Sequence, residues 1–152
     1  SLNGNEMQLT LLRAAATPEM RADNGEHEFT YAFTAWEGSF LDSPVVEEAY
    51  DLNVPMQVAA GACQPFSAFA VDHPNVFIDT VKPAEDGSGD VILRMYEAKK
   101  ADTICALSVN VPAGKVWACD LLENKLEELP VEEGCVKLHF HTFEVKTLRI
   151  ER

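Results

Sequence analysis

Two histidines near the end of the chain have the spacing of a shared strand face. His139 and His141 flank Phe140, so on a strand both imidazoles point to the same side. Two imidazoles placed in this way can hold a divalent metal ion when a third ligand joins them. No third ligand stands at a metal-site spacing, so we expect no metal in this chain. We instead predict that the pair lines a partly exposed strand face while Phe140 points into the core.

A second set of polar side chains lies between Asp23 and His27. Gly25 can adopt a positive φ, which favours a turn at this point. Beyond the turn, alternate side chains are aromatic or imidazole, with the period of two that is typical of a half-buried strand: His27, Phe29, Tyr31 and Phe33. We therefore predict a central strand that runs to about Trp36, with its aromatic face in the core and a rigid polar turn at its start.

Other sequence signatures of catalysis are missing. Glycoside hydrolysis needs a pair of carboxylates, but the acidic residues here, such as Glu127 and Glu128, lie in predicted polar turns. No nucleophile elbow, phosphate-binding loop or dinucleotide fingerprint occurs. The four cysteines have no CxxC spacing, and we expect reduced, buried thiols rather than two disulfides: Cys63, Cys105, Cys119 and Cys135.

Composition limits the classes of partner. The chain has 152 residues, of which 47% are hydrophobic, so it can form a full core. Its formal net charge of -13 argues against nucleic acid and against anionic membrane surfaces as partners. No apolar run is long enough to cross a bilayer, and no signal peptide is visible. We expect a cytoplasmic protein, and because the sequence opens on Ser1, a piece excised from a longer polypeptide.

The pattern of the remaining chain favours an all-β fold with one short helix. Ser43 and Pro44 are predicted to cap and begin a helix that extends to about Tyr50 and stops before Pro55. Strands separated by turn signals are predicted over 7–13, 66–71, 75–82, 91–97, 103–109, 115–122, 135–141 and 143–150. This spacing is typical of an antiparallel β-sandwich, and we expect a single domain over residues 1–152.

Several of these segments together resemble the C-terminal β-domain of bacterial α-mannosidases of glycoside hydrolase family 38. The order and spacing of the segments carry the resemblance over most of the chain: Leu9–Arg13, Asp23–Ala32, Val81–Asp86, Ile92–Glu97, Asp120–Glu123 and Phe143–Arg149. The resemblance implies a sandwich of the galactose-mutarotase-like or supersandwich type. It also implies that the full-length enzyme hydrolyses α-mannosides with retention.

The resemblance places the chemistry outside this chain. The family's Asp nucleophile, acid/base carboxylate and divalent metal, usually zinc, belong to a catalytic domain, and its histidine-x-aspartate metal motif does not occur here. The expected partners are the protein's own N-terminal catalytic domain and an α-mannoside. A homo-oligomer remains open. The chain alone is expected to be inactive.

The resemblance implies one possible site within this chain, the turn that reaches the rim of the sugar site. The matching residues are Asp23, Asn24, Glu26 and His27. Some family members carry an Arg before the matching glycine. Asn24 stands there in this sequence, so an Arg-to-sugar contact is not carried over. His27 has two open interpretations, a rim residue or a structural histidine hydrogen-bonded within the turn.

Two further functions remain as alternatives. One is a carbohydrate-binding or domain-docking module with no part in the reaction, and the other is a free-standing enzyme. Binding modules usually expose Trp or Tyr platforms, whereas Trp36 and Trp117 lie in predicted strands that look buried. The missing motifs argue against an independent enzyme. We therefore favour the non-catalytic mannosidase domain.

Overall fold

The computed structural model describes residues 2–152 and divides into two compact units. The first unit ends at Trp36 and the second comprises Glu37–Arg152. Among its described residues, the first unit has two very short strands as its only regular elements, β1 (Leu2–Asn3) and β2 (Glu6–Met7), which pair with each other. Over the described residues, no helix is both long and apolar enough to span a membrane.

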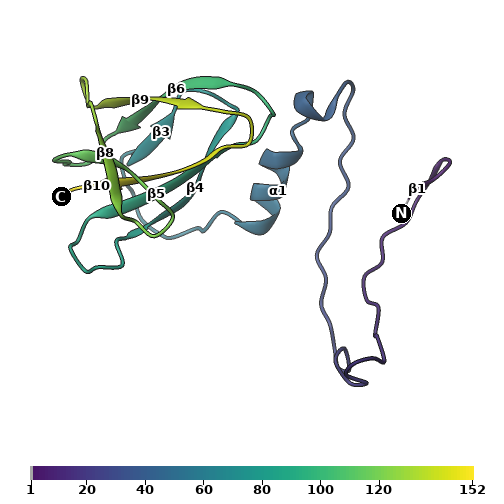
Figure 1. Cartoon of the computed structure of the whole chain (residues 1–152). Coiled ribbons are helices and arrows are strands. Elements are labelled where there is room, and N and C mark those ends of the chain that lie inside the picture. Colours follow the sequence, from purple (N-terminus) through teal and green to yellow (C-terminus); the bar gives the residue numbers. More distant parts are fainter. Residues whose placement is uncertain (1) are drawn as a thin grey trace. The chain divides into compact units, whose positions relative to one another are not determined.

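The second unit is an antiparallel β-sandwich, which confirms the predicted fold class. One sheet has the strand order β4-β5-β10-β7-β8 and the other β3-β6-β9 (Figure 1). The strands of this unit are β3 (Phe69–Val71), β4 (Val76–Pro83), β5 (Val91–Glu97), β6 (Thr103–Val109), β7 (Val116–Cys119), β8 (Lys125–Leu129), β9 (Cys135–Phe140) and β10 (Val145–Ile150).

Side chains from both sheets meet in one core. Strands β5 and β10 contribute Leu93 and Leu148 from the larger sheet, while β6 and β9 contribute Leu107 and Phe140 from the smaller one. All four side chains are almost completely excluded from water. Burial on β9 alternates strictly, with Val136, Leu138 and Phe140 inside and the intervening side chains more exposed. This period of two fixes which side chains of β9 face solvent.

The predicted helix forms, but it begins differently from the prediction. Helix α1 spans Val45–Asn53, and Pro44 is its N-cap. The Ser43 hydroxyl donates instead to the carbonyl of Phe40, at 2.6 Å, which closes a 3-10 turn, η1 (Phe40–Asp42). Tyr50 attaches α1 to the larger sheet by stacking on Phe77 and by donating its hydroxyl to Asp79, at 3.0 Å.

The predicted central strand after the Asp23–His27 turn is wrong. Residues 27–36 belong to no strand or helix. The aromatic side chains that were expected in the core are exposed: Phe29 at 46%, Tyr31 at 66% and Phe33 at 75%. The alternation is real, but this segment forms no ladder with any strand of the described chain. An aromatic face cannot be buried without such a layer.

Other predicted elements also differ from the structure. The strand predicted over 7–13 reduces to the end of β2, and its remaining residues are irregular. Strand β8 was missed because four of its five side chains are exposed, which removes the alternation that identifies a half-buried strand. Trp36 is 41% exposed and Cys63 is also exposed, so the predictions of burial for both were wrong.

Candidate functional site

The Asp23–His27 turn is a real turn with a polar, accessible surface. The amide of Asn24 donates to the carbonyl of Arg21, at 3.1 Å, and Gly25 adopts the predicted positive φ of 140°. The His27 Nε2 donates to the carbonyl of Asp23, at 3.0 Å, which closes the turn. This hydrogen bond occupies one ring nitrogen of His27 and leaves the other, Nδ1, available to a ligand.

The four predicted rim residues lie together in this turn. Asp23 is half-buried, while Asn24, Glu26 and His27 are exposed. The His27 ring stacks on Phe29, with ring centroids 6.0 Å apart. Carboxylate, amide and imidazole groups can accept or donate hydrogen bonds, so the turn has the chemistry to contact sugar hydroxyls or a neighbouring domain.

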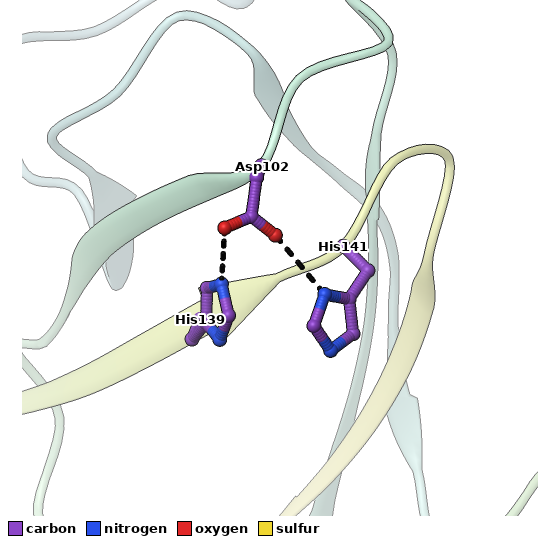
Figure 2. A group of neighbouring side chains, drawn as sticks. All are labelled: Asp102, His139 and His141. Carbon is purple, nitrogen blue, oxygen red and sulfur yellow. Dashed lines mark hydrogen bonds and ion pairs between the residues drawn. The ribbon is translucent and has the colours of Figure 1, made fainter.

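A different cluster lies at one end of the smaller sheet. Asp102 directly precedes β6, His139 lies on β9, and His141 directly follows β9. Strands β6 and β9 pair so that Thr103 lies opposite Phe140, which brings Asp102 beside the two histidines. Figure 2 shows the Asp102 carboxylate between the two imidazoles.

The Asp102 carboxylate binds both rings. Its Oδ2 lies 2.9 Å from Nε2 of His139, and its Oδ1 lies 3.0 Å from Nδ1 of His141. Because a carboxylate only accepts, each of these ring nitrogens carries a hydrogen. The hydrogen bond from His139, followed by the one from His141, lowers the pKa of Asp102. The carboxylate therefore stays negatively charged beside two accessible imidazoles.

The cluster is exposed and rests on a buried support. The side-chain exposures are 65% for Asp102, 47% for His139 and 73% for His141. Phe140, between the histidines, is fully buried, as predicted for a strand face. The amide of His141 also donates to Glu144, at 2.8 Å, which fixes the chain where it leaves β9.

The sequence identified the histidines but not Asp102. Asp102 is 37 residues before His139, and only the pairing of β6 with β9 brings them together. A polar residue that immediately precedes a predicted strand was the one available signal. Within residues 2–152, this is the one group of three potential metal ligands whose ligand atoms all lie within 4.8 Å of one another.

Two buried polar networks support the loops of the sandwich. Arg149 of β10 donates to Asp86, Ser88 and Asp90, all in the loop between β4 and β5. Glu97, which is 1% exposed, accepts from the backbone amides of Lys99 and Phe143. Both networks fix loops of the sandwich.

Cys105 is not placed for reaction as a thiolate. All four are free, and Cys105 is buried in the core. Burial, with a smaller contribution from the Asp72 carboxylate, raises the pKa of Cys105 to about 11. A thiol with a raised pKa is a poor nucleophile at neutral pH.

Comparison with known families decides where the chain belongs. The model of the glycosyl hydrolases family 38 C-terminal beta sandwich domain matches residues 75–148. This chain carries the C-terminal β-sandwich domain of glycosyl hydrolase family 38. The match begins just before β4 and ends within β10, so it covers the strands of the sandwich from β4 onward and leaves out β3.

Individual relatives extend the similarity to nearly the whole chain. Alpha-mannosidase 2C1 of Mus musculus is 38% identical and that of Homo sapiens is 39% identical, each over 97% of this chain. Alpha-mannosidase G of Dictyostelium discoideum is 28% identical over 96% of it. The chain spans only about 15% of the length of the first two relatives and 14% of the third.

The two candidate sites relate differently to the family 38 domain. Asp102, His139 and His141 all lie inside the matched residues, whereas the Asp23–His27 turn lies before them. The similarity to the mammalian relatives covers 97% of the chain, and so nearly all of the first unit as well. The predicted bacterial source and cytoplasmic location remain predictions.

Proposed function

We propose that this chain is a non-catalytic C-terminal part of an α-mannosidase, a retaining glycoside hydrolase that acts on α-mannosides. The observation that carries the proposal is the identity of 38–39% to two α-mannosidases over 97% of the chain. Because the chain corresponds to about 15% of those proteins, most of the enzyme, including its expected zinc site, belongs to other residues. The chain alone is inactive in this proposal.

The first unit packs on the catalytic domain of the same polypeptide. Three alternate aromatic side chains, Phe29, Tyr31 and Phe33, are exposed in a segment with strand-like alternation and no pairing partner in the described chain. An exposed aromatic patch of this kind is typical of a surface that another domain or protein covers. The length of the relatives supports the remainder of the enzyme as the occupant.

The turn at the start of this segment contributes to the rim of the sugar site. If the aromatic face is anchored, the adjacent polar residues Asp23, Asn24, Glu26 and His27 are held at the edge of the same interface. Sugar hydroxyls both donate and accept hydrogen bonds, and this turn offers acceptors together with an amide and an imidazole. A role in orienting residues of the catalytic domain is compatible with the same placement.

The rim contribution is tested in the full-length enzyme. Asp23→Ala and His27→Ala are expected to lower kcat/KM for an aryl α-mannoside by about 10- to 100-fold, with Tm nearly unchanged. Glu28→Ala is the matched control, because Glu28 is an exposed carboxylate of the same segment outside the turn. Unchanged kinetics in both variants, or activity lost only in proportion to folded protein, contradicts the rim role.

The packing of the aromatic face is tested separately. Phe29→Ser and Phe33→Ser should lower the Tm of the full-length enzyme and accelerate proteolysis within the first unit. Phe143→Ser is the control, because Phe143 is also an exposed phenylalanine, at 55%, but lies in the sandwich unit. Equal effects of all three changes would show that exposed apolar area alone, rather than a specific interface, determines the result.

A carbohydrate-binding module with no part in the reaction is the second candidate. Tyr31 is 66% exposed and Trp36 is 41% exposed, which removes part of the argument against an aromatic binding platform. Tyr31→Ala and Trp36→Ala distinguish the two functions. Retention on immobilised mannan that falls while kcat/KM for a small α-mannoside stays constant favours the module. A fall in kcat/KM with unchanged retention favours the packed domain.

A further inference from the structure

We propose that Asp102, His139 and His141 form a binding site for a divalent transition metal ion, with zinc as the best-suited ion. The inference is independent of the proposed function, because it concerns residues of the sandwich and not of the sugar site. It replaces the expectation of no metal in this chain, which depended on the absence of a third ligand from the local sequence. The folded chain supplies that ligand as Asp102.

The ligand set suits the chemistry of such ions. Two imidazole nitrogens and one carboxylate oxygen are the donor types of open zinc sites, in which water takes the fourth position. The same set, when octahedral, also binds other first-row divalent metals, so selectivity depends on geometry and supply. Calcium and magnesium prefer sites made wholly of oxygen ligands and are disfavoured here.

The present spacing is close to that of a bound ion. Zinc bonds of ~2.0–2.1 Å at tetrahedral angles place ligand atoms roughly 3.3 Å apart. The carboxylate oxygens of Asp102 lie 2.9 and 3.0 Å from the facing nitrogens of His139 and His141, and all ligand atoms lie within 4.8 Å of one another. A cation can therefore take the place of the two hydrogens that lie between the Asp102 carboxylate and the imidazoles. Its binding requires shifts of the side chains but not of the backbone.

The backbone holds the ligands in place before any ion binds. The register of β6 on β9 fixes Asp102 beside the histidines, and the buried Phe140 fixes the strand between them. The two imidazoles are already edge to face, with centroids 4.7 Å apart. Because all three side chains are exposed, an ion can enter from solvent and keep bound water. The bound ion ties the start of β6 to the end of β9.

The assignment is tested by adding Co²⁺, a spectroscopic substitute for zinc, to the 152-residue chain. We expect one equivalent of Co²⁺ to produce the visible d–d absorption of a low-symmetry site, and one equivalent of Zn²⁺ to abolish it. Imidazole ¹⁵N NMR should locate the change at Nε2 of His139 and Nδ1 of His141. A thiolate-to-cobalt charge-transfer band would assign the ion to a cysteine such as the exposed Cys63, and would overturn the proposal.

Variants identify the ligands. His139→Gln, His141→Gln and Asp102→Asn should each weaken Zn²⁺ binding by more than about tenfold, since even a change beyond the direct ligands often costs that much. His27→Gln is the control, because it removes an exposed histidine from the other unit and should leave binding unchanged. Circular dichroism should show all four variants folded, since every changed side chain is exposed.

The alternative is a hydrogen-bonded cluster that binds no metal. In that case Co²⁺ and Zn²⁺ produce no saturable signal, or the ligand variants bind as tightly as the unchanged chain. Either result overturns the site. A Zn²⁺ concentration that raises the Tm of the unchanged chain and of His27→Gln, but not of Asp102→Asn, supports it, because only an ion bound to the native state stabilises by mass action.

Discussion

Arg149 of β10 donates from Nε to Oδ2 of Asp90 across 2.7 Å, and both residues are buried. The same guanidinium donates to Asp86 and Ser88, so one side chain holds the whole loop between β4 and β5. Planar guanidinium has several donors in fixed directions, which a lysine ammonium cannot reproduce. The loop geometry therefore depends on arginine specifically.

Removing this guanidinium should destabilise the sandwich strongly. Arg149→Ala leaves Asp90 buried without its cation, and we expect a loss of about 3–5 kcal/mol in the free energy of unfolding. Arg149→Lys should recover only part of it. Urea unfolding at neutral pH measures both. The control is Lys115→Ala, which breaks an exposed pair with Glu128 and should cost far less than Arg149→Ala; equal losses would contradict the assigned role.

Acid should weaken the ion pairs between Arg149 and the carboxylates of the loop between β4 and β5. The backbone amide and hydroxyl of Ser88, followed by the Arg149 guanidinium, hold the pKa of Asp86 well below its usual range. A carboxyl with a lowered folded-state pKa stabilises the protein fully above its unfolded pKa of ~3.9 and loses this contribution as pH falls toward the folded value.

The free energy of unfolding should therefore fall as pH decreases below about 5, and fall less steeply in Arg149→Ala. Part of the dependence should remain in that variant, because the hydrogen bonds from Ser88 persist. Urea unfolding between pH 6 and acid conditions measures the two slopes. Parallel slopes would show that Arg149 does not set the pKa of the loop carboxylates.

Glu97 should also be essential for stability, through backbone hydrogen bonds rather than an ion pair. Its carboxylate accepts from the amides of Lys99 and Phe143, at 2.7 and 3.0 Å. Glu97→Ala leaves these donors without partners, at about 1–3 kcal/mol for each buried group. Glu127→Ala, an exposed change on β8, should stay within roughly 0.5 kcal/mol. Thermal unfolding distinguishes the two.

The isolated chain should show no α-mannosidase activity. The similarity to α-mannosidases covers about 15% of their length, and the chain lacks the metal motif that the resemblance associates with catalysis. Purified chain assayed with an aryl α-mannoside and added Zn²⁺ should give only background hydrolysis. Turnover well above that of a mock purification would contradict the proposal that catalysis belongs to residues outside this chain, even if the cluster at Asp102 binds the added ion.

The sequence predicted strands well where the alternate side chains of the strand pack into the core of the sandwich. Strands β5 and β6 begin and end at the predicted residues, because alternate side chains enter the core, such as Leu93 and Met95 on β5 and Leu107 on β6. The segment from His27 to Phe33 alternates just as clearly, yet remains unpaired. Periodicity describes which side chains share a face, but it contains no information about which strand lies beside them.

The candidate metal site could also be predicted only in part from the sequence. The pair His139 and His141 could be read from a two-residue spacing and a short strand. Asp102 could not, because the register of β6 on β9 is set by packing between side chains far apart in the sequence. The helix was predictable from Pro44 and its acidic first turn, but the role of Ser43 changed when a 3-10 turn took its hydroxyl.

Strand β10 follows every other strand in the sequence but lies in the middle of the larger sheet, between β5 and β7. During synthesis on a ribosome, β5 and β7 emerge first and cannot be joined until β10 has left the exit tunnel. The half-made sheet then presents two unpaired edges, which invite association with other nascent chains. Chaperone demand should therefore peak between the emergence of β7 and that of β10, and a chain truncated within β10 should be an aggregation-prone product.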